Sequence, residues 1–175
     1  MDERLPRAAV AALLLFAAIP GLCVQSRVSE VNAVLDDLHD AASKADFDRY
    51  FSHFTEDAVF LGTDPSERWT TPEFRVYVKA RFEHGGGWTY VPKERHVFFS
   101  KDGNTAWFDE ATRSEKYGAM RGTGVLVRSG KTWRVAQYNL LKPIPNDLFI
   151  RVAEMVESQK PKDSNSAPIA APHNR

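Results

Sequence analysis

The stretch from Thr105 to Asn146 constrains the fold more than any other part of the chain. It contains three runs rich in aromatic and β-branched residues, at 105–113, 120–128 and 131–141, separated by turn signals. Such runs predict three successive antiparallel strands. Charges and amides stand among the apolar residues, so this meander either lines a pocket or carries ion pairs on one face of a sheet.

The part of the chain before this meander predicts helices. Apolar residues recur at helical spacing over 28–42, with Ser29 as the N-cap, and a short helix follows from Asp46. Thr71-Pro72-Glu73 starts a third helix, which ends before glycines 85–87. Short strands are expected at 58–61, 88–91 and 95–100. Helices followed by a mostly antiparallel sheet define the α+β class, with the helices across one sheet face.

Residues 1–26 have the pattern of a secretory signal peptide. Arg4 and Arg7 precede an apolar run at 8–19, which is too short to span the ~30 Å hydrocarbon layer of a membrane. We therefore expect cleavage near residues 23–26, a periplasmic or secreted location and no stable membrane insertion. The alternative is a short anchor that stays on the chain. Residues 28–147 would then form the folded domain, and 148–175 a short helix and a disordered tail.

Charge and cysteine content argue against several classes of function. The chain has 23 basic and 23 acidic residues, so no net field attracts nucleic acid. The single cysteine, Cys23, lies where cleavage is expected, which leaves no thiol for a disulfide or a nucleophile. The five histidines lack metal-ligand spacing, and no phosphate-binding loop or G-x-S-x-G motif is present. We expect no metal and no cofactor.

Several segments between residues 29 and 147 form a familiar combination. They are DFDRYF, FTEDAVFLGTDPSERWT, TPEFRVYVKARF, TAWFDE, RGTGVLV and WRVAQYNLLKPIPN. Together they resemble the SnoaL-like domains of the nuclear transport factor 2-like superfamily, and in particular an exported bacterial subgroup of unknown function. The resemblance implies a cone-shaped α+β fold, with three N-terminal helices packed on a curved, mostly antiparallel sheet. It also implies one apolar pocket and a homodimer formed through the outer sheet face.

The candidate ligand-binding residues come from several elements. We expect the apolar lining to be formed by Phe60, Trp69, Tyr77, Trp107, Val125, Trp133 and Val135. The polar end of the ligand would be bound by Arg121, Gln137 and Asn139, because alternation places Gln137 and Asn139 on the strand face of Trp133 and Val135. The alternatives are a contact between the sheets of a dimer, a solvated surface and, for Trp69, packing on the third helix.

The charged residues of the meander can be interpreted as parts of a site or as structural residues. Glu110 and Arg121 are expected to pair across neighbouring strands, so that Arg121 is aimed at an anionic ligand or the pair lies on a solvated face. Asp109 is either a base in a dry cavity or a strand-edge residue bonded to the backbone or to Arg113. The strand register, which the sequence leaves open, decides between these readings.

Three functions follow from these observations. The first is binding of a small, largely apolar molecule of unidentified nature in the cone. The second is an isomerase, cyclase or dehydratase in which Asp109 or Glu110 is the general base. The third is a dimeric interaction module with a filled core. Members of this superfamily include both enzymes and binding domains, so the fold alone does not distinguish these functions. The side chains inside the cone distinguish them.

Overall fold

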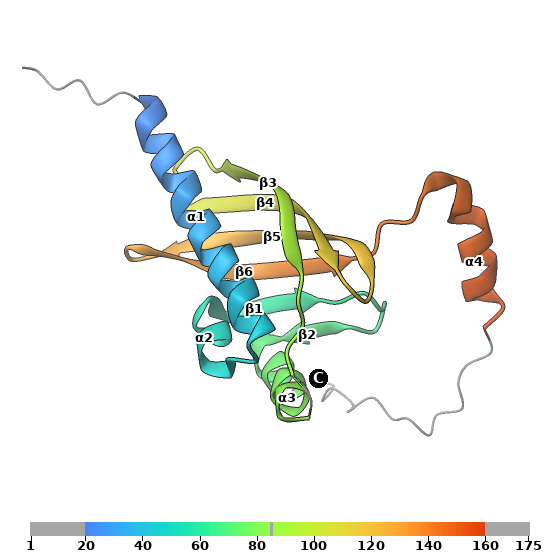
Figure 1. Ribbon diagram of the computed structural model, residues 1–175. Coiled ribbons are helices and arrows are strands. Elements are labelled where there is room, and N and C mark those ends of the chain that lie inside the picture. The colour runs from blue at the N-terminus through green and yellow to red at the C-terminus, as the bar shows by residue number, and fades with distance from the viewer. Residues whose placement is uncertain (1–19, 85, 160–175) are drawn as a thin grey trace, which may run out of the picture.

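A computed structural model describes residues 20–84 and 86–159 of the chain. A six-stranded sheet with the order β2-β1-β6-β5-β4-β3 forms one layer, and α1 runs across one of its faces while α2 and α3 lie near the β1–β2 end (Figure 1). The sheet is curved, and helices α1–α3 cover its inner face. The predicted cone-shaped α+β fold with three N-terminal helices is confirmed.

Three helices precede the meander, and the second and third have a capping interaction at their start. The three are α1 (Pro20–Ser43), α2 (Phe47–Ser52) and α3 (Thr71–Glu83). The Asp46 carboxylate caps α2 by accepting the backbone N–H of Arg49 at 3.2 Å. At the start of α3, the backbone N–H of Thr70 donates to the Glu73 carboxylate at 2.8 Å.

The first helix begins earlier than the sequence indicated. Ser29 lies inside α1, and its hydroxyl donates to the carbonyl oxygen of Gln25 at 3.0 Å, so its assignment as an N-cap was wrong. The helix also extends into the predicted signal segment. The remainder of that segment, residues 1–19, lies outside the described residues, as does the predicted tail from residue 160. None of the described helices is both long and apolar enough to cross a membrane.

The expected meander is β4-β5-β6, with β3 at one edge of it and β1 and β2 at the other. The strand bounds are β1 (Phe54–Leu61), β2 (Arg68–Thr70), β3 (Val91–Phe99), β4 (Thr105–Ser114), β5 (Gly118–Ser129) and β6 (Thr132–Leu141). The pairs β3–β4, β4–β5 and β5–β6 are antiparallel, whereas β1 runs parallel to β6. In place of the two short strands expected at 88–91 and 95–100 there is one edge strand, β3, and residues 88–90 lie outside it. The strand accommodates Pro92 next to a shift in register.

A bulge in β6 reverses the direction of its later side chains. The register to β5 shifts because β6 has one additional residue between Val135 and Gln137. Before the bulge Trp133 and Val135 face inward; after it Tyr138 is buried, while Gln137 is exposed and Asn139 is half-buried on the outer face. The prediction that these two amides share a face with Trp133 and Val135 was therefore wrong.

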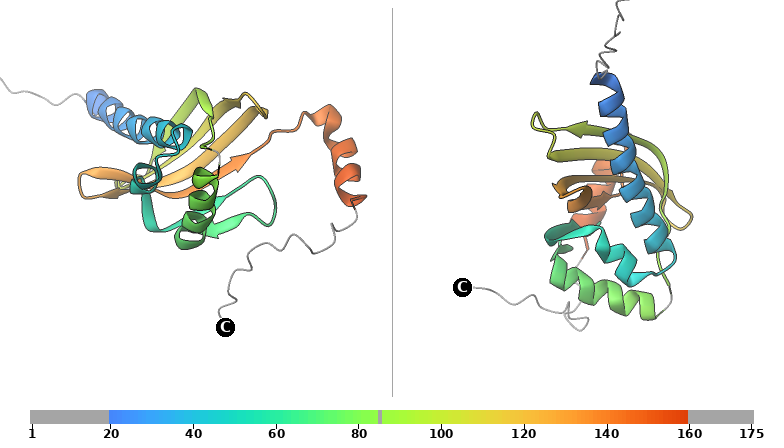
Figure 2. Two further views of the ribbon diagram at one scale, coloured as in Figure 1. Left: turned by 60° about the horizontal axis from the view of Figure 1, so that its bottom comes forward. Right: turned by 90° about the vertical axis from the view of Figure 1, so that its left-hand side faces the viewer.

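The apolar core lies between the sheet and the helices. α1 contributes Val31, Leu35 and Leu38, which are all buried. Beyond β6, a short 3₁₀ helix (Asn146–Leu148) leads into α4 (Phe149–Glu157), which stands away from the sheet (Figure 1 and Figure 2). The core therefore depends on α1–α3 and the sheet, and α4 adds no buried residue to it.

Candidate functional site

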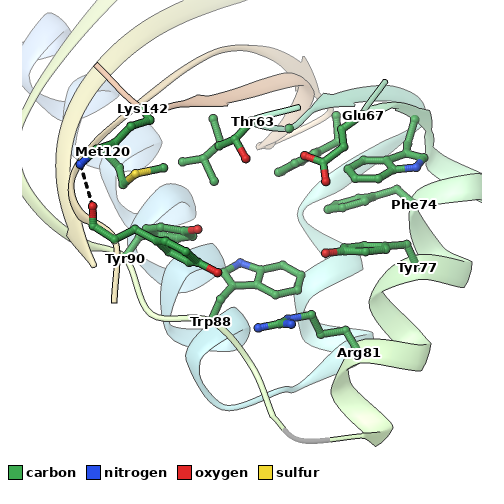
Figure 3. A pocket seen from close by; sticks show the side chains of 14 residues that line it. Thr63, Glu67, Phe74, Tyr77, Arg81, Trp88, Tyr90, Met120 and Lys142 are labelled. Carbon is green, nitrogen blue, oxygen red and sulfur yellow. Dashed lines mark hydrogen bonds between the residues drawn. The ribbon is translucent and has the colours of Figure 1, made fainter. Parts of the chain in front are cut away.

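A cavity of about 340 Å³ opens between α3, the loop after β1 and the ends of β5 and β6 (Figure 3). This volume lies within the range of small-molecule sites. Half of the lining residues are aromatic: Phe60, Trp69, Phe74, Tyr77, Trp88, Tyr90 and Tyr117. The others are Gly62, Thr63, Glu67, Arg81, Met120, Leu140 and Lys142.

One wall of the cavity is a bank of nearly parallel rings. Phe60 on β1 stacks on Phe74 with centroids 4.1 Å apart, and Trp69 on β2 stacks on Tyr77 at 4.8 Å. The sequence produces this arrangement in two steps. Phe60 and Trp69 are direct partners in the β1–β2 pair, and Phe74 and Tyr77 are one turn apart on α3. Because the rings support one another, this wall is formed before any ligand arrives.

The facing part of the cavity is formed by the segment that contains Trp88 and Tyr90. This segment crosses the end of α1, where the Trp88 N–H donates to the carbonyl oxygen of Ala42 at 3.2 Å. A Cβ atom at Gly87 would lie 1.7 Å from that same oxygen, so only glycine permits the approach. The crossing places the Trp88 ring edge-on to Tyr50, at 5.6 Å, and below the opening of the cavity.

The Glu67 carboxylate points into the cavity from the loop after β1 (Figure 3). The loop folds back on itself: the Gly62 N–H donates to the Glu67 carbonyl oxygen at 2.8 Å, and the Asp64 N–H donates to the Glu67 carboxylate at 3.1 Å. A Cβ atom at Gly62 would lie 2.2 Å from the carboxylate oxygen Oε2. The glycine therefore leaves the space in which the Glu67 side chain lies.

Two tyrosines keep their hydroxyl protons at the cavity. Burial raises the pKa of Tyr77; the nearby Arg81 acts in the opposite direction, and the charge of Glu67 adds to the rise. Burial likewise raises the pKa of Tyr90. Both hydroxyls are therefore neutral hydrogen-bond donors at physiological pH. Lys142 is engaged elsewhere, since its ammonium donates to the carbonyl oxygens of Tyr117 and Ala119 at 2.7 and 2.9 Å.

A buried polar cluster lies behind the cavity. Glu110 on β4 has no exposed surface, and we call it and its three partners, His39, Arg95 and Tyr138, the Glu110 cluster. The carboxylate is 2.7 Å from His39 Nε2, accepts from Arg95 Nε at 2.8 Å and accepts from the Tyr138 hydroxyl at 2.8 Å. A second hollow of about 20 Å³ lies between the two sites. It shares Phe60, Trp88, Tyr90 and Leu140 with the main cavity and is also lined by His39 and Tyr138 of the cluster.

The partners of Glu110 keep it ionised. Burial alone would raise the pKa of this carboxyl group, but the hydrogen bond and charge of His39, the charge of Arg95 and the Tyr138 hydroxyl outweigh it and lower the pKa to about 2. Both oxygens of Glu110 take part in these contacts, and the residue does not line the main cavity. It is a structural anion that joins α1, β3, β4 and β6.

The structure brings three of the predicted lining residues together in the cavity and leaves the other apolar ones elsewhere. Phe60, Trp69 and Tyr77 line it. Trp133 and Val135 are buried in the core, where the Trp133 indole N–H donates to Glu30 at 3.2 Å. Trp107 and its strand partner Val125 lie on the outer sheet face, because the alternation of β4 turns Ala106 and Phe108 inward instead.

The predicted polar residues also lie outside the cavity. Arg121 is exposed and stands opposite Ala111, whereas Glu110 stands opposite Gly122, so the expected pair between Glu110 and Arg121 was wrong. The two side chains point to opposite faces of the sheet. Gln137 and Asn139 follow the bulge to the outer face.

Asp109 lies on the outer face as well. It is half-buried there between its strand partners His96 and Thr123. Asp109 therefore lies on the outer face and Glu110 in the buried cluster, and neither of these two candidate bases lines the cavity.

Sequence reasoning did not assign Glu67, Trp88 and Tyr90 to the cavity. Glu67 belongs to the loop between β1 and β2, and Trp88 and Tyr90 fall in the strand expected at 88–91. The usable signal was the run of glycines 85–87, which marks a close approach of two backbones as well as the end of a helix. No group of three or more histidine, cysteine, aspartate or glutamate side chains suited to a metal ion occurs within the described residues.

Solved structures similar to this one define the class of the fold. An NTF2-like protein of unknown function from Pseudomonas putida superposes with a TM-score of 0.59 at 15% identity, covering 70% of this chain and 91% of its own. A candidate dehydratase of the NTF2-like family from Streptomyces avermitilis gives 0.59 at 14% identity, covering 70% and 99%. A ketosteroid isomerase-like protein from Erwinia carotovora atroseptica gives 0.53 at 21%, covering 68% and 98%. These likenesses show the NTF2-like cone.

The sequence narrows this class to one family. Residues 31–145 match the SnoaL-like domain family, and the chain belongs to it. The sequence shows no significant match to a curated protein. The resemblance inferred from the sequence is thereby confirmed. Because proteins with one fold can have different functions, the function has to be inferred from the cavity.

We expect the Glu110 cluster to control stability and its dependence on pH. Replacing Glu110 by Gln should lower the free energy of unfolding by about 3–5 kcal/mol at pH 7, because Arg95 and His39 lose their buried anion. The folded pKa of about 2 is below the ordinary value of 4.5, so this stabilisation is complete above about pH 5 and is lost as the pH falls through 2. Urea denaturation between pH 7 and pH 2 measures both effects.

The matched control for this prediction is Glu56→Gln, which changes an exposed carboxylate on β1. It should leave the free energy of unfolding within about 0.5 kcal/mol of the original. The interpretation fails if Glu110→Gln retains the acid-dependent loss of the unmodified protein.

Proposed function

We propose that this protein is an exported SnoaL-like domain that binds a small, largely apolar molecule in the cavity between α3 and the curved sheet. The observation that carries the proposal is the cavity of about 340 Å³ with aromatic residues forming half of its lining. Export is supported by the charged and apolar pattern of residues 1–26.

The packing of the aromatic wall keeps its rings in place, which favours ligand binding. Phe74 is buried and stacks on Phe60, Trp69 and Tyr77, so these rings lose little conformational freedom when a ligand docks. A ligand would gain most of its affinity from apolar surface removed from water and from ring contacts.

Filling the cavity should abolish binding. Thr63 lies on the exposed rim, so Thr63→Trp should place an indole in the opening without disturbing the core, and it should weaken binding of the neutral probe N-phenyl-1-naphthylamine by about tenfold or more. Fluorescence titration measures the affinity. Thr132→Trp, an equally exposed site at the opposite end of β6, is the control and should bind normally. Equal affinity in both variants would place the ligand elsewhere.

A second candidate function is proton transfer at a carbon next to a carbonyl group. Glu67 faces a cavity that also contains the hydroxyls of Tyr77 and Tyr90, which are kept protonated. The carboxylate would take a proton from the ligand's carbon, the hydroxyls would donate to the resulting enolate oxygen, and the proton would return to another carbon. In this scheme Glu67 replaces Asp109 and Glu110 as the base.

Isomerisation of a small β,γ-unsaturated cyclic ketone tests this second function. The conjugated product absorbs in the ultraviolet, and we expect its formation to slow by about 10²-fold or more in Glu67→Gln, the usual effect of losing a general base. Glu56→Gln should leave the rate unchanged. A rate in the unmodified protein no greater than in buffer would remove the enzymatic function and leave the binding function intact.

We further propose a homodimer formed through the outer sheet face. Phe98 and Trp107 stack on that face with centroids 5.9 Å apart, and they are 48% and 45% exposed. Exposed neighbouring rings of this kind favour burial against another protein surface.

A charge beside Phe98 on this face should separate the subunits. Trp107→Glu should convert a dimer into a monomer in sedimentation velocity experiments, because a carboxylate would be buried without a partner. Val76→Glu, at an exposed position of α3, is the control and should remain dimeric. A monomeric unmodified protein would contradict the proposal directly.

A further inference from the structure

The Glu67 carboxylate is the charged group that enters the cavity most directly. It is half-buried, it points between the aromatic walls, and its hydrogen bond comes from the neutral Asp64 N–H (Figure 3). Within residues 20–84 and 86–159 it forms no ion pair. A partly desolvated carboxylate without a basic partner is unfavourable, and a ligand with a positive charge would compensate it.

The two basic residues of the lining are placed differently. The Lys142 ammonium already donates to two backbone carbonyl oxygens. Arg81 is exposed at the last turn of α3 and lies at the opposite end of the cavity from Glu67, beyond the Trp88 ring (Figure 3). Water screens an exposed guanidinium, so Arg81 contributes less to the interior than the inward Glu67 does.

The aromatic lining, like the Glu67 carboxylate, favours a positively charged ligand. The faces of Trp, Tyr and Phe rings carry partial negative charge and attract ammonium groups, most strongly where water is excluded. The hydroxyl oxygens of Tyr77 and Tyr90 can accept hydrogen bonds from such a group. An anionic ligand, in contrast, would bring a like charge toward Glu67.

We propose that the cavity selects an organic cation, namely an ammonium group carried on an apolar, ring-containing body. The ammonium group lies against Glu67, and the apolar body fills the space between the ring wall of α3 and the segment with Trp88 and Tyr90. This inference rests on the proposed binding function and specifies the chemical class of its ligand.

Three probes of one shape separate charge from apolar contact. They are 1-naphthylmethylamine, which is a cation at pH 7, the neutral 1-naphthylmethanol and the anionic 1-naphthoate. Isothermal titration calorimetry should give the tightest binding for the amine, about tenfold or more tighter than for the alcohol, which is the usual size of a hydrogen bond to a charged group. The anion should bind most weakly.

Variants assign the preference to Glu67. Glu67→Gln keeps the size of the side chain and its acceptor for the Asp64 N–H, so it should remove most of the amine's advantage while leaving the affinity for the alcohol within about twofold. Glu56→Gln is the matched control and should leave all three affinities unchanged.

Each outcome decides the matter. Equal or tighter binding of the alcohol or the anion overturns the cation preference while the binding function stands. An amine preference that survives in Glu67→Gln overturns the role of this carboxylate. If none of the three probes binds, the proposed binding function fails, and the inference fails with it.

Discussion

The rest of the structure depends on the hydrogen bonds and ion pairs that surround the ionised carboxylate of Glu110. A charge without exposed surface is tolerable only because His39, Arg95 and Tyr138 surround it, and these residues come from α1, β3 and β6. The opposing Gly122 is part of the same arrangement, since a Cβ atom there would lie 2.3 Å from the Tyr138 hydroxyl oxygen. The cluster therefore fixes how the helix crosses the sheet, and through it the width of the cone.

Tyr138 connects the Glu110 cluster to the aromatic wall of the cavity. The Tyr138 hydroxyl donates to Glu110, and its ring lies nearly parallel to that of Phe60, with centroids 5.7 Å apart. Phe60 in turn stacks on Phe74 of α3. The aromatic wall is thus positioned by a polar contact behind it. Rings held in this way present a fixed shape to a ligand, whereas Glu67 reaches the same space from a surface loop.

Local patterns in the sequence predicted the scaffold, and long-range pairing decided the site. The meander, the helices and the cone followed from periodicity, turn residues and a family resemblance. One additional residue in β6 was enough to turn Gln137 and Asn139 outward, and no local pattern marks it. Arg95, the true partner of Glu110, comes from β3, and that register depends on a bulge near Pro92. The cavity position of Trp88 required the contact of Gly87 with α1, which is visible only in three dimensions.

The hydrogen bonding of the loop that carries Glu67 has a consequence for how such a protein can diversify. Residues 62–67 make their hydrogen bonds chiefly among themselves, and none of these bonds joins the loop to the Glu110 cluster. Substitutions in this short segment can exchange the charge offered to a guest molecule at little cost to folding. Proteins with this architecture can therefore change the charge at the cavity through a few substitutions in a surface loop, while the core that determines the fold stays the same.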